Sequence, residues 1–318
     1  MRLWAGLIIL TRQMSKKRYS KPALVLTDQV QTLLIARGLD VADTSLAAHC
    51  LSNINYYRLS AYLRYLQVDG DSNHTYQAGT NFDQAMNLYR FDRKIRLLFF
   101  DEIERIEIAV RTQIMYQFSI RFGANWYENA TLFKSPNFQS DFTGILNKEF
   151  SKTTEVFIRH YFTNYDNSIP PPSWMALEII SLGQVSRLYK NLRSNDAKKA
   201  VADNFGVQEP ILESWLESLS YVRNICAHHA RLWNKKIPKS PTLPVSRNVK
   251  GLWVSILPHP SKNNRIFLSF VIMRYLLQFI HPNTHFPRKL KDLLMEYPDV
   301  NNKSLGFPLN WETDPFWA

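Results

Sequence analysis

The stretch that decides the fold is FDRKIRLLFFDEIERIEIAVRTQI, residues 91–114, inside a segment without proline or glycine over residues 81–122. Its apolar residues recur at steps of three and four, namely Ile95, Phe99, Ile103, Ile106, Val110 and Ile114. This spacing places them on one face of an α-helix, whose other faces carry charges of both signs. The stretch therefore predicts a long core helix, with Thr80 and Asp83 as a variant capping box.

Helical patterns continue on both sides of this segment. We expect helices over residues 22–37, 43–67, about 174–192 and about 265–280. Thr27 is a plausible cap of the first, Ser173 caps the third, and Gly183 interrupts it. A further helix starts at Pro210 and runs until Pro238 stops it. No segment alternates as a strand does, so the sequence predicts an all-α fold.

The composition is that of an ordinary globular protein, with 318 residues, 45% hydrophobic and 21% charged. Only two cysteines occur, Cys50 and Cys226, and their wide separation excludes a disulfide framework. This usage suits a reducing cytosol, so we expect a cytoplasmic protein. The apolar run at residues 3–10 is too short to span a bilayer, and the run at 266–280 is short and contains Arg274. We therefore expect no membrane segment.

The net charge of +12 is concentrated in one part of the chain. Residues 218–291 contain 13 lysines and arginines and no aspartate or glutamate, which leaves the remainder close to neutral. A one-sided field of this kind attracts polyanions, and RNA is the partner that we expect. The alternative interpretation is a basic surface that keeps the protein soluble and binds no nucleic acid.

These patterns predict four regions. Residues 1–20 form an N-terminal extension, residues 21–80 an N-terminal helical region, and residues 81–240 the helical core. Residues 241–318 contain a basic, proline-rich loop, a helix and a C-terminal tail.

The densest group of polar side chains lies in LSYVRNICAHHARLWNKK, residues 219–236. On a helical wheel the polar members share one arc of about 140°, and they are Arg223, Asn224, His228, Arg231 and Lys235. Val222, Ile225, Cys226, Leu232 and Trp233 fall on the opposite side. His229 falls among these apolar residues, so we expect it to point toward the core and to support or orient the site.

This combination suits phosphodiester chemistry on RNA. Histidine transfers protons near neutral pH, arginine binds phosphate oxygens, and asparagine can orient an imidazole. The 2′-hydroxyl of RNA is a built-in nucleophile, so the reaction requires no metal. Cys226, His228 and His229 lack a second ligand cluster at zinc-like spacing, and no glycine-rich phosphate loop occurs. We therefore expect no cofactor, and we interpret Cys226 as a core residue.

The segment RNICAH, with Arg223, Asn224 and His228, resembles the motif of HEPN ribonucleases. Four blocks in order, at residues 53–63, 91–114, 171–189 and 221–234, resemble the Abi-like abortive-infection family of the AbiD/AbiF type. The resemblance implies a HEPN-like helical bundle, a role in phage defence or as a toxin, and metal-independent endoribonuclease activity. It also implies a homodimer, because HEPN sites combine an Arg and a His from each of two domains.

Transferred residue by residue, the resemblance makes Arg223 the phosphate-binding residue and His228 the proton-transfer residue. Asn224 is the polar residue after the arginine, with His229, Arg231 and Lys235 in support. Some members of the family work with a small non-coding RNA. HEPN cores often place a polar residue of an earlier helix against the motif arginine, and Glu104 or Glu107 could serve. The simpler interpretation of Glu107 is an ion pair with Arg111 four residues on.

Two alternatives remain open. The chain could be a non-catalytic RNA-binding protein that uses the same basic surface. It could also be an interaction protein in which residues 219–236 form only a dimer seam. Cleavage of RNA that depends on His228 separates these alternatives from the enzyme.

Overall fold

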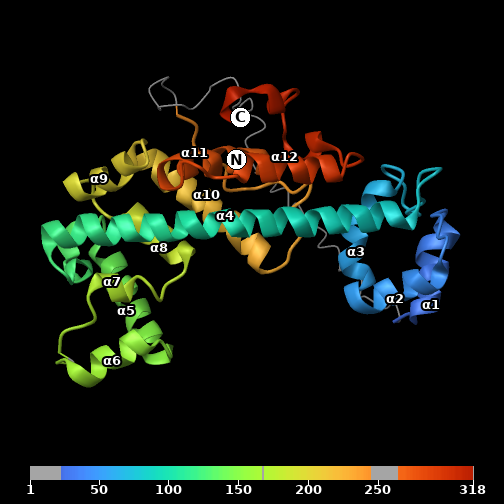
Figure 1. Cartoon of the computed structure of the whole chain (residues 1–318). Coiled ribbons are helices and arrows are strands. Elements are labelled where there is room, and N and C mark those ends of the chain that lie inside the picture. Colours follow the sequence, from blue (N-terminus) through green and yellow to red (C-terminus); the bar gives the residue numbers. More distant parts are fainter. Residues whose placement is uncertain (1–22, 167, 245–263, 318) are drawn as a thin grey trace, which may run out of the picture. The chain divides into compact units, whose positions relative to one another are not determined.

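The computed structural model describes residues 23–166, 168–244 and 264–317, and every regular element in these ranges is a helix. The all-α prediction is therefore confirmed for the described residues. The expected extension at residues 1–20 and most of the expected proline-rich loop lie outside them. The chain divides into two compact units at residues 85 and 86, and α4 (Phe82–Phe122) begins in the first and continues into the second (Figure 1).

The N-terminal unit starts with α1 (Leu26–Asp28), which continues as a π-helical stretch over Gln29–Leu34 and a 3₁₀ turn over Ile35–Arg37. Gly38 ends this helical run in the left-handed conformation, with φ of 90°. The helix predicted at residues 22–37 is confirmed in position. Its predicted cap is wrong, because Val25 rather than Thr27 precedes the first turn.

Two short helices complete this unit, α2 (Thr44–Ile54) and α3 (Tyr56–Leu63), and a 3₁₀ turn over Arg64–Leu66 follows. The Asp43 side chain caps α2 by accepting a hydrogen bond from the Leu46 amide. Asn55 makes the corner between the two helices with a positive φ of 69°. Asparagine adopts this conformation more readily than most residues, so the predicted helical region 43–67 bends here.

The loop after α3 is fixed by its own hydrogen bonds. Both carboxylate oxygens of Asp71 accept backbone N–H groups, from Asn73 at 3.0 Å and from Thr75 at 2.8 Å. Bonds with Thr75 and Asn73 lower the pKa of Asp71 to about 2. The loop therefore has a defined course that brings the buried Tyr76 back to the Arg37 carbonyl, at 2.8 Å.

The long helix α4 has the predicted apolar stripe on its buried face. Phe91 and the residues that follow it at steps of three and four are at most 1% exposed, namely Ile95, Phe99, Ile103, Ile106, Val110, Ile114 and Phe118. Its start differs by one residue from the prediction. Asn81 and Gln84 exchange reciprocal hydrogen bonds of 3.0 Å, so they form the capping box that was assigned to Thr80 and Asp83.

The second unit adds eight helices to the rest of α4 within the described residues. They are α5 (Pro136–Lys152), α6 (Val156–Asn164), α7 (Ser173–Ala176), α8 (Leu182–Asn191), α9 (Asp196–Asn204), α10 (Glu209–Ala227), α11 (Ile266–Ile280) and α12 (Phe286–Glu296). The helix predicted over 174–192 is in fact two helices, and the interruption lies between Ala176 and Leu182 rather than at Gly183, which is inside α8. Ser181 and Gln184 form a capping box that starts α8 after a break, and Ser173 begins α7 rather than capping it.

The core of this unit forms where α4, α10 and the C-terminal helices meet (Figure 1). Phe99 of α4 lies against Phe270 of α11, with ring centroids 6.4 Å apart. Lys289 of α12 bonds Asp101 and Glu102 of α4. The last turns, over Asn302–Leu305, Trp311–Thr313 and Pro315–Trp317, place buried aromatic rings on α11. This packing leaves α10 next to α4, with its charged residues at the edge of the core.

Candidate functional site on helix α10

Helix α10 carries Arg223 and Asn224 of the predicted motif, and His228 caps its end. Pro210 lies in its first turn, as predicted, and its apolar side packs into the core through Leu212, Leu216, Leu219, Val222 and Cys226. Arg223 and Asn224 lie on the opposite, polar side. Tertiary packing of one apolar face therefore presents both side chains away from the core.

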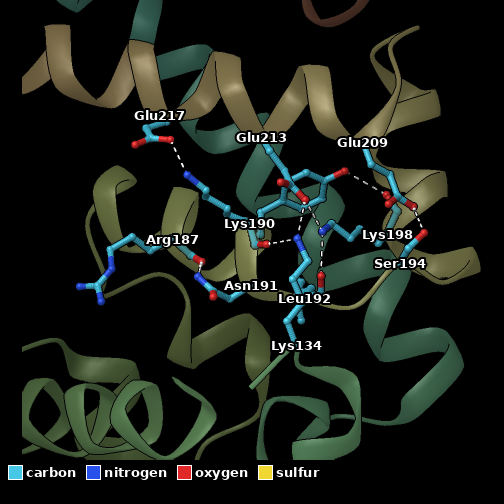
Figure 2. Close-up of polar contacts among 11 residues, drawn as sticks. Lys134, Arg187, Lys190, Asn191, Leu192, Ser194, Lys198, Glu209, Glu213 and Glu217 are labelled. Carbon is cyan, nitrogen blue, oxygen red and sulfur yellow. Dashed lines mark hydrogen bonds and ion pairs between the residues drawn. The ribbon is translucent and has the colours of Figure 1, made fainter. Parts of the chain in front are cut away.

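Three glutamates precede the motif along one side of α10, and each has partners (Figure 2). Glu209 accepts from the Ser194 hydroxyl at 3.0 Å, and Glu217 accepts from Lys190 at 2.7 Å. Glu213 accepts from Lys198, and from Lys134 at 3.2 Å. These contacts hold α10 against its neighbours in the fold. The cation of α10, Arg223, has no close partner among the described residues and lies in the second half of the helix.

Lys198 is the most buried member of this network, at 1% exposed. Besides Glu213, it donates to the Leu192 carbonyl at 2.7 Å, and it lies 5.1 Å from the centre of the Tyr189 ring. Burial lowers the pKa of Lys198, and the hydrogen bond with Glu213 opposes that shift. Lys198 thus forms a buried ion pair with the partly buried Glu213, which also contacts the exposed Lys134.

The end of α10 corrects the prediction that this helix reaches Pro238. The helix stops at Ala227, and His229 takes the left-handed conformation with φ of 52°. The Ala230 amide donates to the Ile225 carbonyl at 3.0 Å, and the His229 amide donates to the Cys226 carbonyl at 2.9 Å. These two bonds define a Schellman turn. The left-handed position of such a turn, here His229, is usually occupied by glycine.

This turn changes the surroundings of the predicted side chains. His229 is exposed, so the prediction that it points into the core is wrong, because the wheel no longer applies beyond Ala227. His228 is exposed at the C-terminal cap. Arg231 and Lys235 are half-buried and follow the helix rather than sharing its polar arc.

Asp92 of α4 holds the segment after the turn, a role that was not predicted from the sequence. It is fully buried and forms an ion pair with Arg96, four residues on. Its Oδ1 accepts the amides of Leu232, at 3.0 Å, and Trp233. Arg96 also donates to the Ala230 carbonyl at 3.4 Å. A carboxylate three residues before Ile95 on the apolar stripe was the available signal, since a buried charge requires partners.

Glu107 of α4 lies against the motif arginine. The Arg223 Nε is 3.9 Å from Glu107 Oε2, while Arg111 donates to Glu107 Oε1 at 2.9 Å. Arg111 also donates to the Ile180 carbonyl at 3.0 Å and to Glu178 at 3.3 Å. The Glu107–Arg111 ion pair is therefore confirmed, and the same carboxylate also faces Arg223.

A small cavity of about 320 Å³ opens beside this contact. Arg223 lines it together with residues of α4, namely Phe100, Asp101, Ile103, Glu104 and Glu107. His228 and Asn224 do not line it, and in the described part of the chain their side chains have no hydrogen bond or ion pair. One protomer thus brings Arg223 and Glu107 together, and His228 lies outside the cavity that they line.

Cys226 is a core residue, as interpreted from its pattern. It is 1% exposed, and burial raises the pKa of its thiol to about 12. A protonated thiol is a poor nucleophile and a poor metal ligand. Within residues 23–166, 168–244 and 264–317, no three histidine, cysteine or carboxylate side chains gather at metal-binding distance.

The fold and the site define an all-helical protein that presents arginine, asparagine and histidine at the end of one helix. A family model described as Abi-like protein matches residues 49–234, more than half of the chain, so the chain belongs to the Abi-like protein family. This membership suggests a role in abortive infection, the defence of bacteria against phage. The chain matches no curated protein and no solved structure. None of the described helices combines the length and the apolar character needed to cross a membrane.

Proposed function

We propose that this protein is a metal-independent endoribonuclease of an abortive-infection system, with its active site formed between two copies of the chain. Arg223 binds and stabilises the scissile phosphate, and His228 transfers the proton of the 2′-hydroxyl. Asn224 orients the substrate or the imidazole. In this proposal the 2′-oxygen attacks phosphorus, the bond to the 5′-oxygen breaks, and the cations stabilise the charge that develops on the phosphoryl oxygens.

The observation that carries the proposal is the incomplete pairing of Arg223. Its side chain is 31% exposed, and the 3.9 Å separation from Glu107 exceeds hydrogen-bond length. The guanidinium therefore keeps donors for a phosphate while Glu107 limits its orientations. His228 is exposed at the end of the same helix, within reach of a ligand that approaches from solvent.

A second copy of the chain supplies what one protomer lacks. Arg223 lines the cavity beside Glu107, whereas His228 lies at the exposed C-terminal cap and does not line it. Beside the Arg223 cavity, α4 exposes Leu97 and Ile108, which are 50% and 51% exposed and share one side of the helix with Glu104. Apolar side chains next to an incomplete polar site favour an interface there.

The acidic residues of the same cavity favour a second candidate, an RNA-binding protein without catalysis. Asp101, Glu104 and Glu107 line the cavity together with Arg223, and their negative charge opposes the approach of a phosphate. In that case RNA binds to the basic segment and Arg223 stays paired. Cleavage assays separate the two candidates, whereas the salt dependence of binding does not, because phosphate contacts dominate both.

Purified protein incubated with total RNA and EDTA tests the proposal. We expect the wild type to cleave RNA despite chelation, and His228→Ala to reduce the rate by about 10²–10⁴-fold, the usual contribution of a general acid or base. His160→Ala is the matched control, since it removes another exposed histidine, on α6. RNA that stays intact with wild-type protein would refute the enzyme and leave the binding protein.

Mixing two inactive variants tests the composite site. A dimer of one Arg223→Ala chain and one His228→Ala chain retains one arginine and one histidine across its interface. We expect co-refolded mixtures to recover measurable cleavage, whereas each variant alone has almost none. If both residues act within one protomer, the mixture has no intact site and stays inactive. Light scattering of Leu97→Glu and Ile108→Glu shows whether the exposed side of α4 forms the dimer.

A further inference from the structure

The N-terminal unit contains a cavity of about 640 Å³ that the proposed cleavage site does not use. Its wall combines residues of the first helical turns, the corner between α2 and α3, and the loop that leads back to Tyr76. Its volume lies within the range of about 300–1,000 Å³ that is usual for small-molecule sites. The cavity is therefore large enough to hold a ligand rather than only water.

The charges of the wall favour an anion. Arg37 and Arg64 line the cavity, and none of its lining residues in the described part of the chain is acidic. Neither arginine forms an ion pair with a carboxylate within residues 23–166, 168–244 and 264–317. Guanidinium groups bind phosphate through parallel N–H donors, so a phosphate is the anion that matches the pair best.

The remaining wall residues match a nucleobase. Tyr56 and Tyr57 present two aromatic rings, and Tyr57 is 86% exposed. The side-chain amides of Asn55 and Gln67 add hydrogen-bond donors and acceptors. Proteins that bind unpaired nucleotides stack bases on aromatic rings and read their edges with groups of this kind.

The wall is held in place without a ligand. Asn55 adopts a positive φ at the helix corner, and its Oδ1 accepts the Tyr57 amide at 2.7 Å. The Gln77 amide donates to the Leu66 carbonyl at 2.8 Å, which closes the loop over the cavity wall. A preformed wall lowers the entropic cost of binding, which favours a specific ligand over a chance surface contact.

We propose that this cavity binds a nucleotide, with the phosphate at Arg37 and Arg64 and the base against Tyr57. The nucleotide is either a free mononucleotide or one unit of a single-stranded RNA. The RNA case rests on the proposed function, and the mononucleotide case does not. An acidic or phosphorylated peptide satisfies the arginines alone and leaves the tyrosine and amide groups without a role.

Titration calorimetry on the full chain tests the cavity with AMP, UMP and a short 2′-O-methyl RNA, which cannot be cleaved because its 2′-oxygen is blocked. Tyr57→Ala and Arg64→Gln alter exposed wall residues. Tyr65→Ala and Arg58→Gln are the matched controls, since they are exposed residues of the same segment that do not line the cavity. We expect Tyr57→Ala to weaken binding by roughly 5- to 100-fold and the controls to bind like the wild type.

Binding of mononucleotides identifies a free nucleotide as the ligand, and binding of the oligonucleotide alone identifies RNA. Equal affinities in the wall variants and the wild type would overturn the proposal, as would inorganic phosphate or a phosphoserine peptide binding as tightly as the nucleotides. Cleavage assays run in parallel keep the two proposals apart. Loss of nucleotide binding with normal cleavage refutes only the cavity, and retained binding without wild-type cleavage refutes only the nuclease.

Discussion

The two halves of α10 carry opposite charges, and they differ in how completely these charges are paired. In the first half, Glu209, Glu213 and Glu217 each contact a donor from α8, α9 or the loops beside them, as Figure 2 shows. In the second half, Arg223 has one distant carboxylate, and His228 faces solvent. The acid-free run of residues 218–291 begins directly after Glu217.

This difference shows why charge density alone does not identify a functional site. The Lys198–Glu213 pair is buried and satisfied, so it contributes to the packing of one structure and has no capacity left for a ligand. Arg223 is partly exposed and has only a long ion pair with Glu107, so in the proposed function it can change partner when a phosphate arrives. The incomplete pairing, rather than the number of charges, favours the second half of α10 as the site.

The largest effect that we expect separates activity from stability on the same helix. Arg223→Ala should lower the rate of RNA cleavage by about 10²–10³-fold, as the loss of one donor to a developing oxyanion does. Its free energy of unfolding should change little, because the side chain is partly exposed and its ion pair is long. Single-turnover cleavage and urea unfolding measure the two quantities. A large loss of stability would mean that Arg223 is a structural residue like those of the first half.

Glu213→Ala should have the opposite effect, with a loss of stability and an unchanged rate of RNA cleavage. It leaves the buried Lys198 charge without its partner, which costs about 3–5 kcal/mol of unfolding free energy. Urea denaturation should show this loss, and the cleavage rate of the protein that remains folded should match the wild type. A decrease in cleavage that exceeds the unfolded fraction would contradict a purely structural role for the first half.

Lys198→Met tests the same pair from its other side. Methionine fills the space without a buried charge, so we expect stability to stay constant or to rise by up to about 4 kcal/mol. The lowered pKa of Lys198 gives the sign of the pH dependence. The unfolded state binds more protons than the folded state, so wild-type stability rises with pH as the folded pKa is passed. The advantage of Lys198→Met should therefore shrink toward alkaline pH, which unfolding curves at several pH values would measure.

The turn that ends α10 can be tested by comparing glycine and alanine at position 229. A helix that ends at Ala227 and a helix that reaches Pro238 predict stability differences of opposite sign between these two variants. His229→Gly should be more stable than His229→Ala by about 1 kcal/mol, because alanine is strained at a φ of 52° and glycine is not. If the helix continued to Pro238, glycine would instead be less stable than alanine by about 1 kcal/mol. Both variants remove the imidazole, so the comparison isolates the backbone. Thermal unfolding of the two proteins decides between the descriptions.

The smallest effect concerns Glu217 at the junction of the two halves. Hydrogen bonds from Lys190 and Lys239 lower its pKa below its ordinary value of 4.5. A lowered carboxyl pKa contributes stability above the unfolded value and loses it as pH falls through the folded value. Glu217→Gln should cost at most about 1 kcal/mol at pH 7, and the difference from the wild type should vanish under strongly acidic conditions. If the stability difference between Glu217→Gln and the wild type persisted at acidic pH, it would come from packing rather than from charge.

Long periodic patterns made part of this molecule predictable from sequence. The apolar stripe, together with the absence of proline and glycine over residues 81–122, gave α4 almost to its ends, and the apolar run at residues 266–280 gave α11. The end of α10 was not predictable from periodicity, since Leu232 and Trp233 continue the apolar pattern while the backbone has already turned at His229. Neither glycine nor proline marks that turn.

The residues of the motif could be predicted from the sequence, whereas the residues of other helices that contact them could not. Arg223, Asn224 and His228 could be named from residue types and spacing, because arginine and histidine have specific chemistry. The role of Asp92 depends on a contact across about 140 residues of sequence, with Leu232 and Trp233. Only tertiary structure shows such a contact. The break before α8 had a local signal, since Ser181 and Gln184 have the spacing of a capping box.

Helix α4 contacts the motif segment at two places, Arg223 through Glu107 and Leu232 through Asp92. These two carboxylates are fifteen residues apart, or about 22 Å along a helix axis. The segment that leaves α10 and the arginine of α10 therefore contact the same helix, the first through short hydrogen bonds and the second through a longer ion pair. Slow amide exchange at Leu232 and Trp233 would then report on the integrity of α4 around Asp92.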